Sequence, residues 1–266
     1  MPRATVSSTR FVPRDVRFSI SFPSAVGDYV EVGDVYAFER TDTFSCCGYF
    51  KATSFGATNM SLIRKSSTVT SNAQGWAVLI DTASRQMSFF MSSNSATIRI
   101  NQPLLATIEL NKWYFWALSY DGSATAAGVQ MICIPLGTAL TAFNTKDAPV
   151  NDNLTSGSTV NSQFLCIGRA SNSARQFFGN QTKTSVFTAA LSLADFQNIY
   201  YNNTYPASLG STWSGEAATG SGTVEDEVGT FDGTLQGLAA WSSETPFLKR
   251  ATSSARSAAL ARTTAV

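Results

Sequence analysis

The 266-residue chain contains no histidine, and charged residues make up only 14% of it. Histidine is the commonest general base in enzymes, the partner of serine and cysteine nucleophiles, and a frequent zinc ligand. Its absence removes those mechanisms. Carboxylate chemistry is the route that remains for an enzyme, and we expect a protein without catalytic residues.

Cysteine is also scarce, and its spacing does not favour a metal site. The four cysteines follow no Cys-x-x-Cys pattern, and two of them, Cys46 and Cys47, are adjacent in a strand-like run. Neighbouring side chains of a strand point to opposite faces, so this pair is unsuited to zinc. Cys133 and Cys166 lie among apolar residues. We expect buried free thiols and a reducing compartment.

Long hydrophobic runs are missing as well. No stretch of about 18 apolar residues occurs, and the first residues contain no apolar segment of signal-peptide length. We therefore expect neither membrane insertion nor conventional secretion.

The net charge is only +1, but it is unevenly distributed. Residues 1–17 carry +3 and residues 249–266 carry +4, which leaves −6 for residues 18–248. We interpret these ranges as a basic N-terminal arm, one domain, and a basic C-terminal arm or tail. The arm residues are Arg3, Arg10, Arg14, Lys249, Arg250, Arg256 and Arg262. Nucleic-acid binding is not expected, because no aromatic residue is interleaved with the C-terminal charges.

Aromatic residues, serine, threonine and glycine are abundant and favour strands and turns. Residues 28–50 predict a strand, a polar excursion and a second strand. Short strands are predicted at 60–64, 75–81, 85–92 and 97–101. Residues 112–120 are apolar or aromatic at nearly every position, so this strand should be central and covered on both faces. Residues 129–135 are its expected antiparallel neighbour.

The second half of the chain combines loops, strands and one helix. Residues 141–162 and 205–222 are predicted to cross the surface, residues 163–168 to form a strand, and Gly179-Asn180 to form a turn or bulge. Ser192 is a helix N-cap and Asp195 completes an approximate capping box. An apolar stripe follows, so we expect one short helix near 192–201.

Four segments, taken in order, resemble laminin-G-like or pentraxin-like domains of the concanavalin A-like lectin and glucanase superfamily. They are YVEVGDVYAFERTDTFSCCGYFKA, LNKWYFWALSYDGS, FLCIGR with FFGN, and AALSLADFQNIYYN. The resemblance covers roughly residues 18–248. It implies an all-β jelly-roll sandwich of two antiparallel sheets. The chain departs from that pattern at Thr182 and Lys183, where relatives usually carry an Asp-Glu pair.

Carboxylates give only weak signals for a site. No Glu-x-Asp-x-x-Glu string of the glucanase type occurs, and the nearest pairs, Glu31 with Asp34 and Glu225 with Glu227, are more typical of solvated strand ends or turns. Calcium could use clustered loop oxygens. The candidate ligands for it are Glu225, Asp226, Asp232 and Asp121. A solvated acidic loop is the alternative, and no other cofactor is expected.

Two functions without catalysis remain open, and a third is catalytic. The first is a virion structural protein, a capsid decoration or fibre-associated subunit of the kind found on phage particles. Such a protein would assemble in the host cytoplasm and lie on the virion surface. Its partners would be other capsid subunits and further copies of itself. The second is a carbohydrate-binding adhesion module for cell-surface glycans. Trp76, Trp213 and Trp241 are candidates for sugar stacking, although most aromatic residues of a sandwich belong to the core. A polysaccharide hydrolase ranks last.

Overall fold

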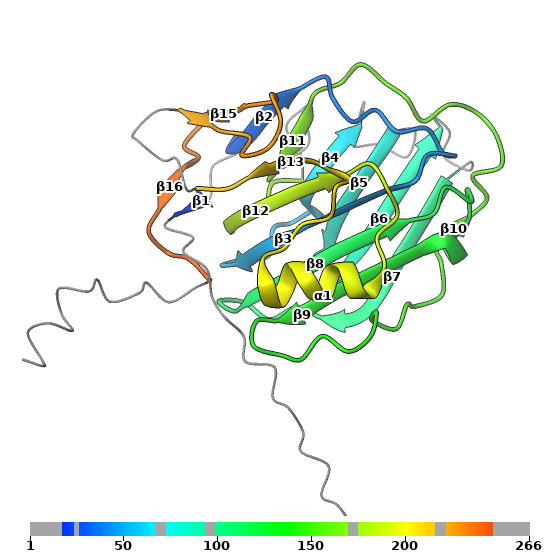
Figure 1. Ribbon diagram of the computed structural model, residues 1–266, viewed down its shortest axis with the longest axis horizontal. Coiled ribbons are helices and arrows are strands. Elements are labelled where there is room, and N and C mark those ends of the chain that lie inside the picture. The colour runs from blue at the N-terminus through cyan, green and yellow to red at the C-terminus, as the bar shows by residue number, and fades with distance from the viewer. Residues whose placement is uncertain are drawn as a thin grey trace, which may run out of the picture.

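The computed structural model describes residues 18–23, 27–66, 73–93, 99–169, 175–215 and 222–246. Two antiparallel sheets pack face to face, and a short helix lies against one of them (Figure 1). The all-β jelly-roll sandwich predicted from the sequence is confirmed. The basic segments 1–17 and 249–266, with all their arm residues, lie outside the described residues.

We call the two sheets A and B. In the described chain, sheet A has the order β16 (Ala240–Ser242), β1 (Ser19–Phe22), β12 (Gly179–Phe187), β3 (Phe44–Ala52), β8 (Trp113–Tyr120), β9 (Val129–Pro135), with β13 (Leu209–Trp213) also paired to β12. Sheet B has the order β10 (Asn151–Asp152), β7 (Arg99–Thr107), β6 (Gln86–Ser93), β5 (Gln74–Asp81), β4 (Met60–Ser66), β11 (Leu165–Ile167), β2 (Tyr29–Gly33), β15 (Gly233–Gln236), β14 (Thr223–Val224). A 3₁₀ turn at Ala126–Gly128 precedes β9.

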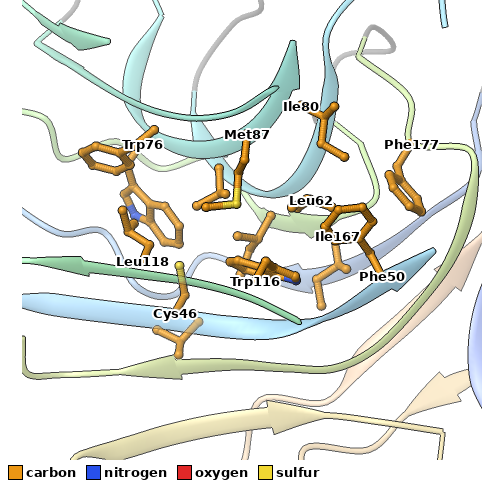
Figure 2. Packing of buried hydrophobic residues seen from close by; sticks show 14 of the residues in the cluster. Cys46, Phe50, Leu62, Trp76, Ile80, Met87, Trp116, Leu118, Ile167 and Phe177 are labelled. Atoms are coloured by element: carbon orange, nitrogen blue, oxygen red, sulfur yellow. The ribbon is translucent and has the colours of Figure 1, made fainter. Parts of the chain in front are cut away.

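The main core fills the space between the two sheets. Figure 2 shows Trp116 and Leu118 of sheet A facing Trp76 and Met87 of sheet B. All four side chains are inaccessible to solvent. Fully burying one large apolar side chain stabilises a fold by about 1.5–3 kcal/mol, so this layer is the principal source of stability.

Strand β8 is buried on both of its faces, as its sequence predicts. Trp116 and Leu118 belong to the core between the sheets, whereas Phe115 and Ala117 belong to a second apolar cluster on the outer side of sheet A. Its predicted antiparallel neighbour is also confirmed, because β9 pairs with β8 along its whole length. An alternating pattern with two apolar faces requires a cover on each side, and the second cover is the helix.

Helix α1 (Leu193–Asn202) covers the outer face of sheet A. It begins with the predicted capping box: the Asp195 amide donates to Ser192 Oγ at 3.3 Å, and the Ser192 amide donates to Asp195 Oδ2 at 2.9 Å. Phe196, Ile199 and Tyr200 are buried against the sheet. Asn203, with φ of 52°, ends the helix in the left-handed region that asparagine tolerates.

Three local predictions are wrong in part. Gly179 and Asn180 do not form a turn or bulge: they begin β12, and the irregularity lies between Thr182 and Ser185, where Lys183 has φ of 49°. Residues 141–162 include the short strand β10 and the buried Leu154, so this segment packs on the sandwich as well as crossing its surface. Residues 205–222 include β13, because burial of the Trp213 side chain favours pairing of this strand with sheet A.

All four cysteines are free and buried. Cys46 points into the core between the sheets and Cys47 into the cluster under α1, the opposite orientations predicted for adjacent strand residues. Among the described residues, no helix has the length and hydropathy needed to cross a membrane.

Candidate functional site

The outer faces of the two sheets differ. Helix α1 covers the outer face of sheet A (Figure 1). A groove of about 750 Å³ lies on the outer face of sheet B, over β4, β5, β6 and β7. Ligand sites are typically concave and combine apolar surface with a few polar groups. This groove is therefore the candidate site.

Side-chain alternation determines the floor of the groove. In β6, Met87, Phe89 and Met91 enter the core, so Ser88 and Phe90 point outward and line the groove. Strand register places Phe90 opposite Asn101 of β7 on one side and Ala77 of β5 on the other.

Phe90 is the unusual residue of this floor. In the part of the chain that the structure describes, two clusters of buried apolar side chains occur, and Phe90 belongs to neither. Its side chain is half-buried, and the neighbouring Ala77 is small and completely buried. An aromatic ring that contributes to no core and faces a hollow is available to a ligand.

One wall of the groove is the segment 147–150, which is held against the edge of β7. The Val150 amide donates to the Asn101 carbonyl at 2.9 Å, and the Asp147 amide donates to the Pro103 carbonyl at 3.1 Å. The buried side chain of Gln102 adds a bond from Nε2 to the Asp147 carbonyl at 2.9 Å. These bonds fix the wall to the sheet, so the groove is formed before any ligand enters.

Three arginines contribute to the groove from separate parts of the chain. Arg64 lies on β4 and is only 2% exposed, Arg99 begins β7, and Arg175 precedes β12. Burial lowers the pKa of Arg64, and the nearby positive charge of Arg175 lowers it further. Burial also lowers the pKa of Arg175, which Asp81 partly opposes.

The two carboxylates of the groove are engaged in turns. Asp81 Oδ1 accepts hydrogen bonds from the amides of Ala83 and Ser84 at 3.0 and 2.8 Å and from Ser84 Oγ at 3.0 Å. Burial alone would raise the pKa of Asp81, but these hydrogen bonds outweigh it and hold the pKa below its usual value. Asp147 Oδ1 accepts from the Ala148 amide at 2.7 Å.

The acidic residues proposed for calcium are placed elsewhere. Asp226 Oδ1 accepts from the amides of Thr212 and Val228, and the Asp226 amide donates to Asp232 Oδ1 at 2.9 Å, so these two carboxylates organise the turn that contains Glu225. Asp121 lies in the connection between β8 and β9, where Oδ1 accepts from the Ser123 amide. No group of three or more His, Cys, Asp or Glu residues is placed to hold a metal ion among the residues described. Calcium binding stays a prediction.

The other residues singled out in the sequence have structural roles. Trp76 and Trp213 are completely buried and Trp241 packs on the core, so the interpretation of Trp76 and Trp213 as stacking residues is wrong. Asp34 pairs with the buried Lys65. Lys183 Nζ lies 4.0 Å from Glu227 Oε2.

The groove residues were not predicted from the sequence, although β6 carried a signal. In MSFFMSS the residues Ser88, Phe90 and Ser92 alternate with apolar ones, and one phenylalanine stands on an otherwise polar face. The arginines could not be grouped in advance, because three strands and the segment 147–150 must fold before they meet.

Comparison with known proteins agrees with this architecture. The family model for the concanavalin A-like lectin/glucanases superfamily, Laminin_G_3, matches residues 24–197, which is more than half of the chain. No curated protein matches the sequence.

Solved structures that share the fold at low identity include the following two proteins. A candidate carbohydrate-binding protein from Bacteroides ovatus is 14% identical with a TM-score of 0.61, covering 89% of this chain, while the chain spans 62% of its length. The heptameric SAP-like pentraxin of Limulus polyphemus is 13% identical with a TM-score of 0.52, covering 84% of this chain and 97% of the pentraxin. The chain belongs to the concanavalin A-like lectin/glucanases superfamily, as a laminin-G-like domain.

Proposed function

We propose that this domain binds carbohydrate in the groove on the outer face of sheet B. The observation that carries the proposal is Phe90, a half-buried ring that contributes to neither core cluster and lies on the floor of the hollow. The superfamily supports it, since lectins are part of that superfamily's description. The similar fold of the Bacteroides ovatus protein, a candidate for carbohydrate binding, points the same way.

The chemistry of the groove suits a sugar. A pyranose ring has an apolar face, formed by C–H groups, that packs on an aromatic ring, and a rim of hydroxyls that both donate and accept hydrogen bonds. Phe90 supplies the ring. Asn101 beside it offers an amide donor and acceptor, and Ser88 contributes a hydroxyl group. Apolar contact is thus combined with a few polar groups at fixed positions.

Binding is favoured over hydrolysis by the state of the groove carboxylates. A glycosidase needs one carboxylic acid with a raised pKa as proton donor and a second carboxylate as base or nucleophile. The pKa of Asp81 is lowered instead, and its Oδ1 is occupied by the turn at Ala83 and Ser84. Asp81 would therefore remain ionised and would be a poor acid at neutral pH.

The role as a virion structural protein stays a prediction, and so does its location on the virion surface. It rested on the basic segments 1–17 and 249–266, which lie outside the described residues. The groove gives the adhesion-module alternative a specific place to bind, so that alternative is our proposal.

A glycan array tests the proposal with a matched pair of variants. Phe90→Ala removes the groove ring, and Phe164→Ala removes a phenylalanine that is 45% exposed and does not line the groove. We expect the wild type and Phe164→Ala to bind the same glycans and Phe90→Ala to lose that signal, because stacking on an aromatic ring contributes much of sugar affinity. Absence of binding by the wild type, or equal binding by the two variants, would refute the proposal.

A further inference from the structure

The groove has a net positive charge, although the domain as a whole is acidic. Residues 18–248 have a net charge of −6, whereas the charged residues that line the groove are three arginines and two aspartates, a net charge of +1. Field lines concentrate in a concave site with low-dielectric walls, so a local charge of this sign attracts anions in spite of the net charge of the whole molecule.

Two of the arginines, the buried Arg64 and the half-buried Arg175, place like charges near each other. Arg64 is 2% exposed, and its Nη2 donates to Ser66 Oγ at 2.9 Å, so the guanidinium is fixed beside the sheet. The charge of Arg175 acts on it strongly enough to lower its pKa. Placing a second cation near the buried Arg64 guanidinium costs free energy, and an anion bound beside them would reduce that cost.

Arg99 is held through Nε, which leaves its two terminal guanidinium nitrogens for a ligand. Its Nε donates to Asn151 Oδ1 at 2.6 Å, while its main chain exchanges bonds with Asn153, from the Arg99 amide to Asn153 Oδ1 and from the Asn153 amide to the Arg99 carbonyl. Within the described part of the chain, the two terminal nitrogens of Arg99 have no hydrogen-bond partner. A guanidinium oriented through Nε presents these two donors as a fork that matches carboxylate or sulfate oxygens.

The groove aspartates reduce the positive charge of the groove but do not remove it, because three arginines outnumber them. Asp81 Oδ1 accepts hydrogen bonds from its own turn and Asp147 Oδ1 accepts one from the Ala148 amide. Within the described residues neither aspartate is paired with Arg99, so the two terminal nitrogens of Arg99 remain for the ligand.

Building on the proposed carbohydrate binding, we infer that the groove selects glycans that carry an acidic group, a carboxylate or a sulfate, and that Arg99 is the residue that contacts this group. Phe90 would hold the sugar ring, and Arg64 and Arg175 would strengthen the positive potential around it. Arg99 would then determine specificity, while the ring supplies binding shared by all sugars.

A glycan array tests the selectivity if it pairs neutral glycans with carboxylated and with sulfated counterparts of the same backbone. Binding confined to the acidic glycans supports the inference. Comparison of the carboxylated with the sulfated glycans then identifies which anion is bound. Preferential binding of neutral members would overturn the inference but leave the proposed function intact. Absence of binding to every member would overturn both.

Matched variants then test the assignment to Arg99, using the full chain and the best acidic glycan from the array. Arg99→Gln and Arg40→Gln each remove one positive charge, and each breaks a bond from Nε to the segment 141–162, since Arg40 Nε donates to the Gly157 carbonyl at 3.2 Å outside the groove. We expect Arg99→Gln to weaken binding roughly tenfold or more, the effect of losing a charge-assisted hydrogen bond. Arg40→Gln should change the affinity by less than about twofold.

Equal weakening by the two variants, or no weakening by either, would overturn the assignment and would place acidic-glycan binding outside the groove, for example on the basic segments 1–17 and 249–266. Arg99→Lys provides a second measurement. It keeps the charge and loses the fork, so its affinity should fall between wild type and Arg99→Gln. Unfolding temperatures of all variants identify any that are destabilised.

Discussion

Replacing Phe196 with alanine tests whether α1 is a packed cover of sheet A. Phe196 is completely buried and belongs to the cluster that joins α1 to β8 and β9. Its ring meets that of Phe143 edge to face, with centroids 6.2 Å apart and an interplanar angle of 87°. The substitution removes the ring while the capping box at the start of the helix is left unchanged.

The magnitude follows from burial and from the cavity left behind. A fully buried phenylalanine replaced by alanine costs about 3–5 kcal/mol, which includes lost transfer free energy and unfilled space. The edge-to-face pair with Phe143 accounts for about 0.5–1.5 kcal/mol of this value. Domains are typically stable by about 5–15 kcal/mol, so we expect a folded variant with a much lower unfolding midpoint.

Urea denaturation followed by tryptophan fluorescence measures the change, with linear extrapolation to water. Phe143→Ala is the control: it removes the half-buried partner of the same pair and should cost less. Glycan binding by Phe196→Ala should stay at the wild-type level, because the groove lies on the other sheet. A loss of free energy below about 1 kcal/mol would refute the packing described for α1.

Three further outcomes follow from local contacts. Ser192→Ala should lower the free energy of unfolding by about 1 kcal/mol, because Ser192 Oγ caps the helix, and a loss near zero in urea denaturation would contradict this. The pKa of Asp81 is lower in the folded protein than in the unfolded chain, where it is about 4. The ionised carboxylate therefore stabilises the fold above about pH 4, and this stabilisation is lost as the pH falls through the pKa of the folded state. Asp81→Asn should therefore destabilise at pH 7 and have little effect near pH 2, and an equal effect at both would argue against the turn contacts. Burial raises the pKa of Cys133 and Cys166 to about 12, so a thiol reagent at pH 8 should modify the protein only in denaturant, and reaction of native protein would show that these thiols are accessible.

Much of the fold could be predicted because local patterns and packing agree. The residues of β8 are apolar on both faces, which requires a cover on each side, and the structure provides the second sheet and α1. Ser192 and Asp195 define a helix start through contacts three residues apart, so no distant part of the chain is needed.

Predictions failed where tertiary pairing outweighed local preference. Gly179 suggested a bulge, but pairing of Gly179 with Ala52 keeps it in register, and the irregularity moves to Lys183. The glycine-rich and serine-rich residues 205–222 predicted a surface crossing, whereas the Trp213 ring enters the core between the sheets.

The candidate site was the least predictable part. Arg64, Arg99 and Arg175 are far apart in the sequence, and they meet only when sheet B orders β4 and β7 and the Arg175 carbonyl accepts from the Ser61 amide of β4. Phe90 could have been noticed as a lone aromatic on a polar strand face. No local sequence pattern, however, indicates that the outer face of sheet B stays uncovered while α1 covers the outer face of sheet A.

The central claim is that carbohydrate binds on the outer face of sheet B, and the most direct measurement is the position of a bound glycan. Amide chemical shifts of the full chain would be recorded by NMR while the best glycan from the array is added. We predict that the largest changes fall on β6 and β7, around Phe90 and Arg99, with α1 unaffected. Saturable changes centred on α1, or on any surface other than the groove, would contradict the account.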